Sequence, residues 1–201
     1  MKICFTLDDV LRKKTYQMCQ VYKKKVNADI NLESLKLDEK DMMKELNFTD
    51  KNEYNKFLYE DYPYEIFGEA PVAYKLLAPD FNMWLLGLTN LDIEEPVGVM
   101  IANPFEFNLS IGWTCFFLSK LASRAREYYF PTDSITIWDR CDMLITAEPR
   151  LIKEKPDGKI CVKIEMPYNK DLEADYTYAS VKDFLNDKEK FYELIEEKEG
   201  I

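Results

Sequence analysis

Short apolar runs that end in polar residues recur along this chain, and the first of them opens it. Ile3, Cys4 and Phe5 are followed by the paired carboxylates Asp8 and Asp9. A nearly continuous apolar run of this length is typical of a parallel strand that helices cover on both faces. Open α/β sheets bind ligands at the carboxyl ends of such strands, so the two acidic residues mark a candidate site. The predicted strands are residues 2–6, 97–102, 127–130, 142–146 and 159–165.

Between the first two predicted strands, apolar residues recur at helical spacing among lysines and acidic residues. Residues 9–26 fit an amphipathic helix, and further helices are predicted over 108–126 and 183–199. The pattern of residues 81–95 fits an extended segment and a helix equally well. We therefore expect a three-layer α/β core with a parallel sheet of about five strands, in which the first strand is central. The predicted units are a core of residues 1–11 and 97–201 and a helical insertion of residues 12–96.

The charge of the chain narrows the classes of partner. Its 201 residues carry a net charge of −10, with 37 acidic and 27 basic side chains. Nucleic-acid backbones and anionic membranes attract positive surfaces, so neither is expected as the main partner. The chain has no histidine, which removes the usual general base and the commonest metal ligand. Catalysis would therefore have to rest on carboxylates.

The cysteines indicate a reducing compartment. Five are scattered along the chain without a C-x-x-C pair, four of them in apolar surroundings. They are typical of small core residues in a reducing cytosol, and neither a zinc site nor a disulfide framework is expected. The chain opens without a basic-then-apolar leader and has no run of about 18 apolar residues, so neither secretion nor a membrane span is predicted.

The segment Phe5-Thr-Leu-Asp-Asp-Val10 resembles the first motif of the haloacid dehalogenase-like (HAD) phosphohydrolase superfamily. In that family a hydrophobic strand runs into Asp-x-Asp, where the first Asp attacks phosphorus and the second is the general acid/base. The resemblance places Thr6 in the position of the nucleophile and Asp8 in that of the acid/base. It implies a Rossmann-like HAD core with a parallel sheet and a helical cap-type insertion between strands 1 and 2.

Two later segments resemble further motifs of the same superfamily. The strand at 97–102 ends in Ala102, where the family's second motif has a Ser or Thr that binds a phosphate oxygen. The segment Asp142-Met-Leu-Ile-Thr-Ala-Glu-Pro149 resembles a strand of 5′-nucleotidase-like members, with Thr146 and Ala147 in place of two acidic residues that bind Mg²⁺. The resemblance thus comes with the nucleophile, the phosphate ligand and the metal-binding acids all replaced.

Two functions from different classes follow. The preferred one is a non-catalytic structural or adaptor protein, a pseudoenzyme without cofactor or metal, because only Asp8 of the family's anchoring residues remains. Thr6 is a poor nucleophile without an adjacent base or metal. Groups that act as a unit lose nearly all of their joint effect when several are removed. The alternative is a Mg²⁺-dependent phosphatase or 5′-nucleotidase-like hydrolase with an atypical metal site made of Asp8, Asp9 and Asp142.

Residues 57–68 are the most aromatic stretch of the chain. One interpretation is that these rings pack the insertion against the core. The other is a surface that binds a partner, since tyrosine-rich patches combine a large contact area with polar groups. The candidate interaction residues are Tyr59, Tyr62, Tyr64, Phe67 and Trp84.

A narrower resemblance covers most of the chain. Segments 57–68, 103–120 and 129–131 are similar to those of an uncharacterised HAD-like family in the structural gene block of crAss-like bacteriophages, which infect gut Bacteroidales. The resemblance implies a virion protein of the portal or tail neck, made in the reducing cytoplasm of the host. Its implied partners are portal or tail proteins and copies of itself in a ring.

Overall fold

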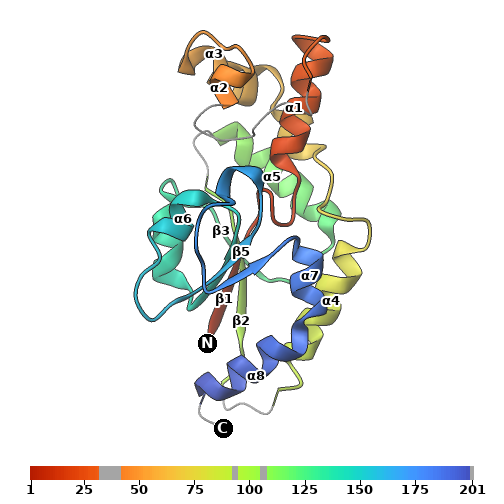
Figure 1. Cartoon of the computed structure of the whole chain (residues 1–201). Helices are drawn as coiled ribbons and strands as arrows, with labels where there is room; N and C mark the ends of the chain where they lie inside the picture. Colours follow the sequence, from red (N-terminus) through yellow and green to blue (C-terminus); the bar gives the residue numbers. More distant parts are fainter. Residues whose placement is uncertain (32–41, 92–94, 105–107, 200–201) are drawn as a thin grey trace.

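The computed structural model describes residues 1–31, 42–91, 95–104 and 108–199, and its centre is a six-stranded sheet (Figure 1). All neighbouring strands are parallel, in the order β3-β2-β1-β4-β5-β6. β1 is an interior strand between β2 and β4, as the apolar opening of the chain predicts. The strands are β1 (Lys2–Thr6), β2 (Gly98–Ala102), β3 (Glu127–Tyr129), β4 (Met143–Thr146), β5 (Ile160–Ile164) and β6 (Tyr176–Tyr178).

The five strands predicted from apolar runs are confirmed, and the pattern does not reveal the sixth. Ile3, Cys4 and Phe5 of β1 have no exposed area, so this strand is buried on both faces. Burial on both faces explains why its sequence lacks polar alternation. β6 has only three residues, of which Thr177 is exposed and the two tyrosines are half-buried, so it carries no apolar run.

Helices cover both faces of the sheet, which makes the core three layers thick. Phe5 belongs to the hydrophobic cluster on one face, and Cys4 belongs to the cluster on the other. Alternate residues of β1 thus anchor the two outer layers. The first face packs against α4 (Leu77–Leu88), α5 (Asn108–Leu121), α7 (Val181–Asn186) and α8 (Lys188–Glu199), and the second against η4 (Ser134–Arg140) and α6 (Pro149–Lys153).

Trp84 of α4 lies in the cluster on the first face. Its ring centroid is 5.4 Å from that of Phe5 and 5.8 Å from that of Phe184. Trp84 is 1% exposed, so it packs in the core and offers no contact surface, which corrects its expected role as an interaction residue. Because α4 packs on the sheet, Leu77–Leu88 contribute to the core cluster, although the predicted insertion of residues 12–96 includes them.

The insertion between β1 and β2 has a hydrophobic cluster of its own. It joins apolar side chains of α1 (Lys14–Lys25) to those of the short helices that follow. Asp50 begins one of these helices, since its side chain accepts hydrogen bonds from the backbone N–H groups of Asn52 and Glu53. In Figure 1, α1, α2 and α3 lie beyond the carboxyl ends of the strands. The short helices are α2 (Met42–Glu45), α3 (Lys51–Lys56) and two π-helical segments, η2 (Phe57–Asp61) and η3 (Tyr64–Gly68).

Several helix ends differ from those that the apolar pattern predicts. α1 begins at Lys14 rather than at Asp9, because Asp9 lies in a tight turn with a left-handed φ of 58°. α5 ends sooner than predicted because Ala122, with a φ of 50°, turns the chain out of the helix. The last predicted helix is divided at Asp187 into α7 and α8. None of the helices in the described part of the chain is long and apolar enough to cross a bilayer.

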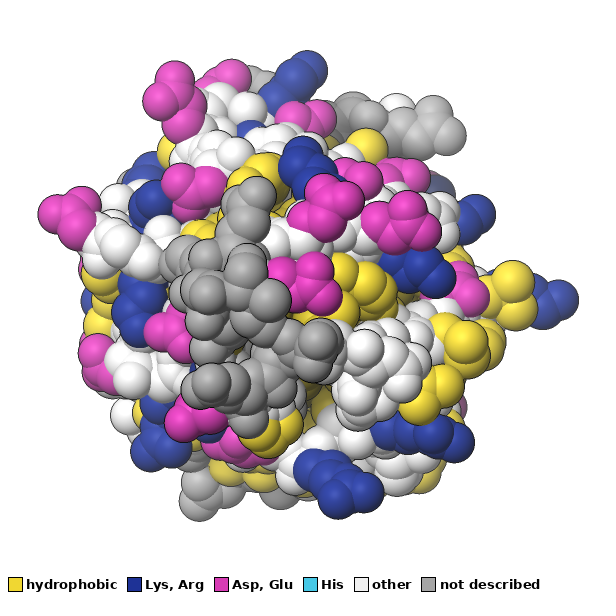
Figure 2. Space-filling model, turned by 90° about the horizontal axis from the view of Figure 1, so that it is seen from below, with side chains coloured by type: hydrophobic (Ala, Val, Ile, Leu, Met, Phe, Trp, Pro, Cys, Tyr) yellow, Lys and Arg dark blue, Asp and Glu magenta, His cyan; other side chains and the backbone are white. Residues whose placement is uncertain are grey.

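A hollow of about 610 Å³ lies at the end of the sheet where the strands begin. Its walls are apolar side chains of α4 and of the segment that leads into β2, and Arg124 and Arg126 stand beside them. Figure 2 looks at this end of the molecule, where hydrophobic side chains gather among side chains of both charges. We refer to this surface, between residues 85–91, 96–99 and 124–126, as the basal hollow.

Gly87 and Gly112 provide a matched test of how α4 and α8 pack. A Cβ atom at Gly87 would overlap the hydroxyl oxygen of Tyr192, which donates a hydrogen bond to the carbonyl oxygen of Trp84. A Cβ atom at Gly112 would meet nothing within 4 Å. Replacing Gly by Ala in an open helix position adds about 0.5–1 kcal/mol of stability.

We therefore expect Gly112→Ala to raise the free energy of unfolding. Gly87→Ala should lower it, because the Tyr192 ring must leave its place and loses its hydrogen bond, which costs about 1 kcal/mol before any loss of packing. Urea unfolding of the two variants beside the wild type measures both effects. Equal stabilisation by the two substitutions would contradict the observed contact between α4 and α8.

Candidate functional site

The carboxyl ends of β1, β2 and β4 bring the motif positions together. Thr6 pairs in register with Ala102 of β2, and its hydroxyl donates a hydrogen bond to the hydroxyl oxygen of Thr146 of β4 at 3.1 Å. Ala147 follows directly in the chain and has no exposed area. Thr6 itself is 4% exposed. Where the HAD motifs would place carboxylates, the structure therefore has a small cluster of buried hydroxyl and methyl groups.

Asp8 is bound to Arg12, whose side chain has no exposed area. Nε and Nη2 of the guanidinium both donate to Oδ1 of Asp8, at 2.8 and 2.5 Å. Nη1 donates to the carbonyl oxygen of Phe67 in η3 and to the hydroxyl oxygen of Thr114 in α5. The guanidinium carbon lies 5.5 Å from the ring centroid of Phe67 and 5.3 Å from that of Phe117. A charge buried this deeply requires a partner, so Asp8 is the counter-ion of Arg12.

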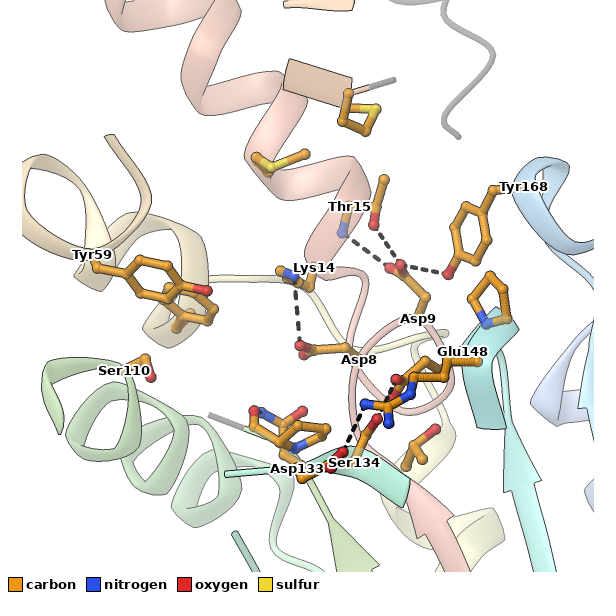
Figure 3. A pocket seen from close by; sticks show the side chains of 18 of the residues that line it. Asp8, Asp9, Lys14, Thr15, Tyr59, Ser110, Asp133, Ser134, Glu148 and Tyr168 are labelled. Carbon is orange, nitrogen blue, oxygen red and sulfur yellow. Dashed lines mark hydrogen bonds and ion pairs between the residues drawn. The ribbon is translucent and has the colours of Figure 1, made fainter. Parts of the chain in front are cut away.

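Asp9 points away from Asp8 and joins two other elements (Figure 3). Its carboxylate accepts hydrogen bonds from the backbone N–H and the hydroxyl of Thr15 at the start of α1. It also accepts one from the hydroxyl of Tyr168 in η5 (Pro167–Asn169), at 2.9 Å. Burial raises the pKa of Asp9 because desolvation disfavours the charged form, and the hydrogen bonds from Thr15 only partly oppose this.

A cavity of about 480 Å³ lies between these strand ends and the insertion (Figure 3). Nζ of Lys14 faces Oδ2 of Asp8 at 3.9 Å. On another wall, Arg150 forms an ion pair with Asp133 at 2.7 Å. The charged residues that line the cavity are Asp8, Asp9, Lys14, Asp133, Glu148 and Arg150. We call this space the strand-end cavity.

The residues at this site do not fit Mg²⁺, the metal that the motif resemblance implies. Mg²⁺ requires a near-octahedral set of oxygen ligands that includes carboxylates. Thr146 and Ala147 stand where the metal-binding acids would be. Asp8 is the one carboxylate among the motif positions, and the guanidinium of Arg12 binds it. In the described part of the chain, no three Asp, Glu or Cys side chains are grouped closely enough to hold a metal ion.

Asp142, the third member of the atypical metal site, lies at the other end of β1. Its carboxylate accepts hydrogen bonds from the backbone N–H of Lys2 at 2.8 Å and from Nζ of Lys159 at 3.3 Å. Burial acts to raise the pKa of Asp142, but these hydrogen bonds outweigh it and lower the pKa. Asp8 and Asp9 follow the opposite end of β1, so the three carboxylates do not form one site.

The aromatic stretch 57–68 contributes both to packing and to the surface. Phe67 is 3% exposed, and its ring stacks on that of Tyr59 with centroids 5.6 Å apart. Both rings line the strand-end cavity. Tyr62 is half-buried, and Tyr64, 36% exposed, is the most accessible of the predicted interaction residues. Tyr59 and Phe67 of this stretch therefore cover the strand-end cavity, and the ring of Tyr64 is exposed outside it.

The sequence pattern gives little sign of three residues that shape the site. Arg12 follows Asp8 by four residues, a spacing that suits an ion pair, but a basic residue in an amphipathic segment is usually solvated. Asn103 directly follows β2 and Tyr168 lies in η5, far apart in the chain, and only the parallel sheet brings them to one cavity. No local spacing could have joined them.

No family model and no curated protein sequence matches this chain. Among solved structures, its fold is similar to that of a protein described as a haloacid dehalogenase-like hydrolase from Burkholderia xenovorans. The TM-score is 0.57 over 94% of this chain and 97% of that one. The fold is HAD-like. The two sequences are 11% identical, so the likeness concerns the fold alone.

Asp9→Asn should remove a pH-dependent loss of stability. A carboxyl group whose pKa is raised by folding holds its proton more tightly in the native state. Its contribution to stability therefore falls as the pH rises from the ordinary range of aspartic acid through the higher native pKa. Asn tolerates the left-handed turn and carries no charge. Relative to the wild type, Asp9→Asn should gain stability as the pH rises from about 4 to 7.

Urea unfolding of both proteins at several pH values measures this difference. Asp139→Asn, at an exposed acidic residue outside the cavity, provides the control, and its difference from the wild type should stay small throughout. A stability difference for Asp9→Asn that does not change with pH would contradict the burial of this carboxyl group.

Proposed function

We propose that this protein is a non-catalytic protein with a HAD-like fold that works by binding other proteins. The observation that carries the proposal is the ion pair of Asp8 with the fully buried Arg12. A general acid/base must exchange a proton with the reacting group. Proton transfer through Asp8 would leave the charge of Arg12 buried without its counter-ion, which is strongly unfavourable. Asp8 therefore stabilises the fold and is unsuited to catalysis.

The hydroxyl of Thr6 also lacks the means to act as a nucleophile. Its one hydrogen has two acceptors within reach, the hydroxyl oxygen of Thr146 at 3.1 Å and the carbonyl oxygen of Ile145 at 3.4 Å. Neither acceptor is a base that could remove the proton, and activation of a hydroxyl needs an adjacent base or a metal. This supports binding rather than phosphoryl transfer.

An accessible aromatic cluster supports a protein partner. The ring of Trp113 in α5 lies 4.8 Å from that of Tyr64 in η3, and Phe116 lies 5.9 Å from Tyr64. Phe116 is 40% exposed. Residues 108–119 contain no charged side chain in a chain that is 32% charged. We refer to Tyr64, Trp113 and Phe116 as the aromatic face, and Nζ of Lys120 lies 5.1 Å from the centroid of the Phe116 ring. Exposed aromatic rings are typical of protein interfaces.

The resemblance to the phage family leads us to propose a place for this protein in a virion. There, portal or tail proteins and copies of itself in a neck ring would be its partners. A closed ring requires two different patches on each copy. We propose the aromatic face as one patch and the basal hollow as the other. Arg124 and Arg126 in the hollow would meet the acidic surface of a neighbour, since the net charge of each copy is −10.

Asp8→Asn should destabilise the protein rather than only silence a reaction. Loss of the carboxylate leaves Arg12 buried and unpaired, which should lower the free energy of unfolding by about 3 kcal/mol. In the double variant Asp8→Asn/Arg12→Met the unpaired charge is gone, so the combined loss should be smaller than the sum of the two single losses. Urea unfolding of the four proteins measures the coupling.

In parallel, the wild type should release no phosphate from nucleotides or p-nitrophenyl phosphate with Mg²⁺. Clear turnover that Asp8→Asn abolishes would overturn the non-catalytic assignment. Unchanged stability in Asp8→Asn would show that the ion pair has no structural role.

Phe116→Glu should weaken assembly by placing a charge in the aromatic face. Wild-type protein at high concentration should form a ring or a complex with portal or tail proteins, and native mass spectrometry should show fewer or smaller assemblies of the variant. Tyr16→Glu, at a 54% exposed ring of α1, is the matched control and should assemble as the wild type does. A wild-type protein that stays monomeric and is never found in purified particles would contradict the virion role.

A further inference from the structure

We propose that the strand-end cavity receives a cationic side chain of a partner protein, the guanidinium of an Arg or the ammonium of a Lys. This inference rests on the proposed function, because it names the chemistry by which a non-catalytic site would hold its partner. The ligand is opposite in charge to the phosphate group that the motif resemblance implies. Four features of the cavity support it.

The lining of the cavity is acidic. Among the described residues, four carboxylates, Asp8, Asp9, Asp133 and Glu148, line it with two cations, Lys14 and Arg150. Adding the ion-pair partners behind the lining, Arg12 and Glu154, gives five carboxylates and three cations, so the formal excess remains two negative charges. The raised pKa of Asp9 reduces this excess without reversing its sign. The net charge of the whole chain, −10, adds a field that repels anions.

The two cations of the lining are already held by carboxylates. Arg150 pairs with Asp133 at 2.7 Å and with Glu154 at 3.2 Å. Nζ of Lys14 lies 3.9 Å from Oδ2 of Asp8. An anionic ligand would have to displace these acids, whereas a cationic ligand adds a second partner to carboxylate oxygens that still have lone pairs available.

A buried acceptor in the cavity lacks a donor. Asn103, 5% exposed, lines the cavity, and its Oδ1 has no hydrogen-bond partner among the described residues. The side-chain Nδ2 donates to the carbonyl oxygen of Pro104 at 2.9 Å, which sets the orientation of the amide and leaves Oδ1 as the orphan atom. A buried acceptor is stabilised by a ligand that donates hydrogen bonds. A guanidinium or an ammonium group donates and cannot accept, whereas the ionised oxygens of a phosphate only accept.

Aromatic rings complete the walls. Tyr54, Tyr59, Phe67 and Tyr168 all line the cavity. Ring faces attract cations, more strongly where water is excluded. The chain already uses this chemistry next to the cavity, because the guanidinium of Arg12 lies over the Phe67 ring. A second guanidinium or ammonium would find acidic oxygens, an orphan acceptor and ring faces in one space.

The test compares charged probes with neutral isosteres on the full-length, isotope-labelled protein by NMR titration. Butylguanidinium is compared with butylurea, and the peptide amide Gly-Gly-Arg-Gly-Gly with its citrulline counterpart, which has the same shape without the charge. Inorganic phosphate is the anionic probe. We expect the charged member of each pair to bind at least about tenfold more tightly and to shift the resonances of Asn103 and Tyr168, while phosphate leaves them unchanged.

Variants tie the binding to the cavity. Asn103→Leu removes the orphan acceptor, and Asp133→Asn removes one charge while an Asn can still cap η4, so both should weaken binding of the Arg peptide several-fold. Asp139→Asn, at an exposed acid of η4 outside the cavity, is the control and should bind as the wild type does.

Equal binding of charged and neutral probes, or tighter binding of phosphate, would overturn the inference. Binding of butylguanidinium without the Arg peptide would overturn the protein source and assign the cavity to a free small cation. These outcomes leave the proposed function standing, because the absence of phosphate release and the assembly through the aromatic face are measured separately.

Discussion

The fold around the site depends on one buried charge. Arg12, in the loop between β1 and α1, donates hydrogen bonds to Asp8, to the carbonyl oxygen of Phe67 and to the hydroxyl oxygen of Thr114, so one side chain connects the loop after β1, η3 and α5. A guanidinium without exposed area must have its hydrogen bonds and its charge satisfied, and Asp8 meets both needs. The position of the insertion over the strand ends is therefore fixed by an internal cation.

The residues at the carboxyl ends of β1 and β4 determine what the site can hold. The side chains of Thr6 and Thr146 form a hydrogen bond between the carboxyl ends of β1 and β4. The two acidic residues after β1 bind groups of the protein itself. Asp8 accepts hydrogen bonds from Arg12, and Asp9 accepts them from Thr15 and Tyr168. The cavity persists because the strands beneath it belong to the hydrophobic core. Acidic and aromatic side chains line its walls. The same architecture thus offers oxygen acceptors where a phosphate site would offer donors.

The core strands could be predicted because a strand that is buried on both faces has an uninterrupted run of apolar residues. Ile3, Cys4 and Phe5 are apolar in succession since each meets a packed layer. β6 and the helix containing Trp84 could not be predicted in the same way. β6 is too short for a pattern, and α4 is apolar around much of its circumference, so its periodicity does not separate helix from strand.

The site was predictable only where it follows a strand. Thr6 and Thr146 end apolar runs and could be placed at one edge of the sheet from the sequence. Arg12 could not, because its burial results from three segments that meet only in the folded chain. Asn103 directly follows β2, but the lack of a donor for its side-chain oxygen among the described residues follows from tertiary geometry. The sequence therefore predicts which residues lie at the carboxyl edge of the sheet, and the structure is needed to show which hydrogen bonds and ion pairs they form there.

The two outermost strands of the sheet limit how copies of this protein can join. β3 and β6 have three residues each, so each presents few backbone groups to another strand. Short edges of this kind discourage continuation of a sheet from one molecule into the next. An assembly of this chain must then be held by side chains on its helices and loops. The arrangement of the copies would depend on the shape and charge of those side chains. The copies could dissociate while the backbone hydrogen bonds within each chain stay intact.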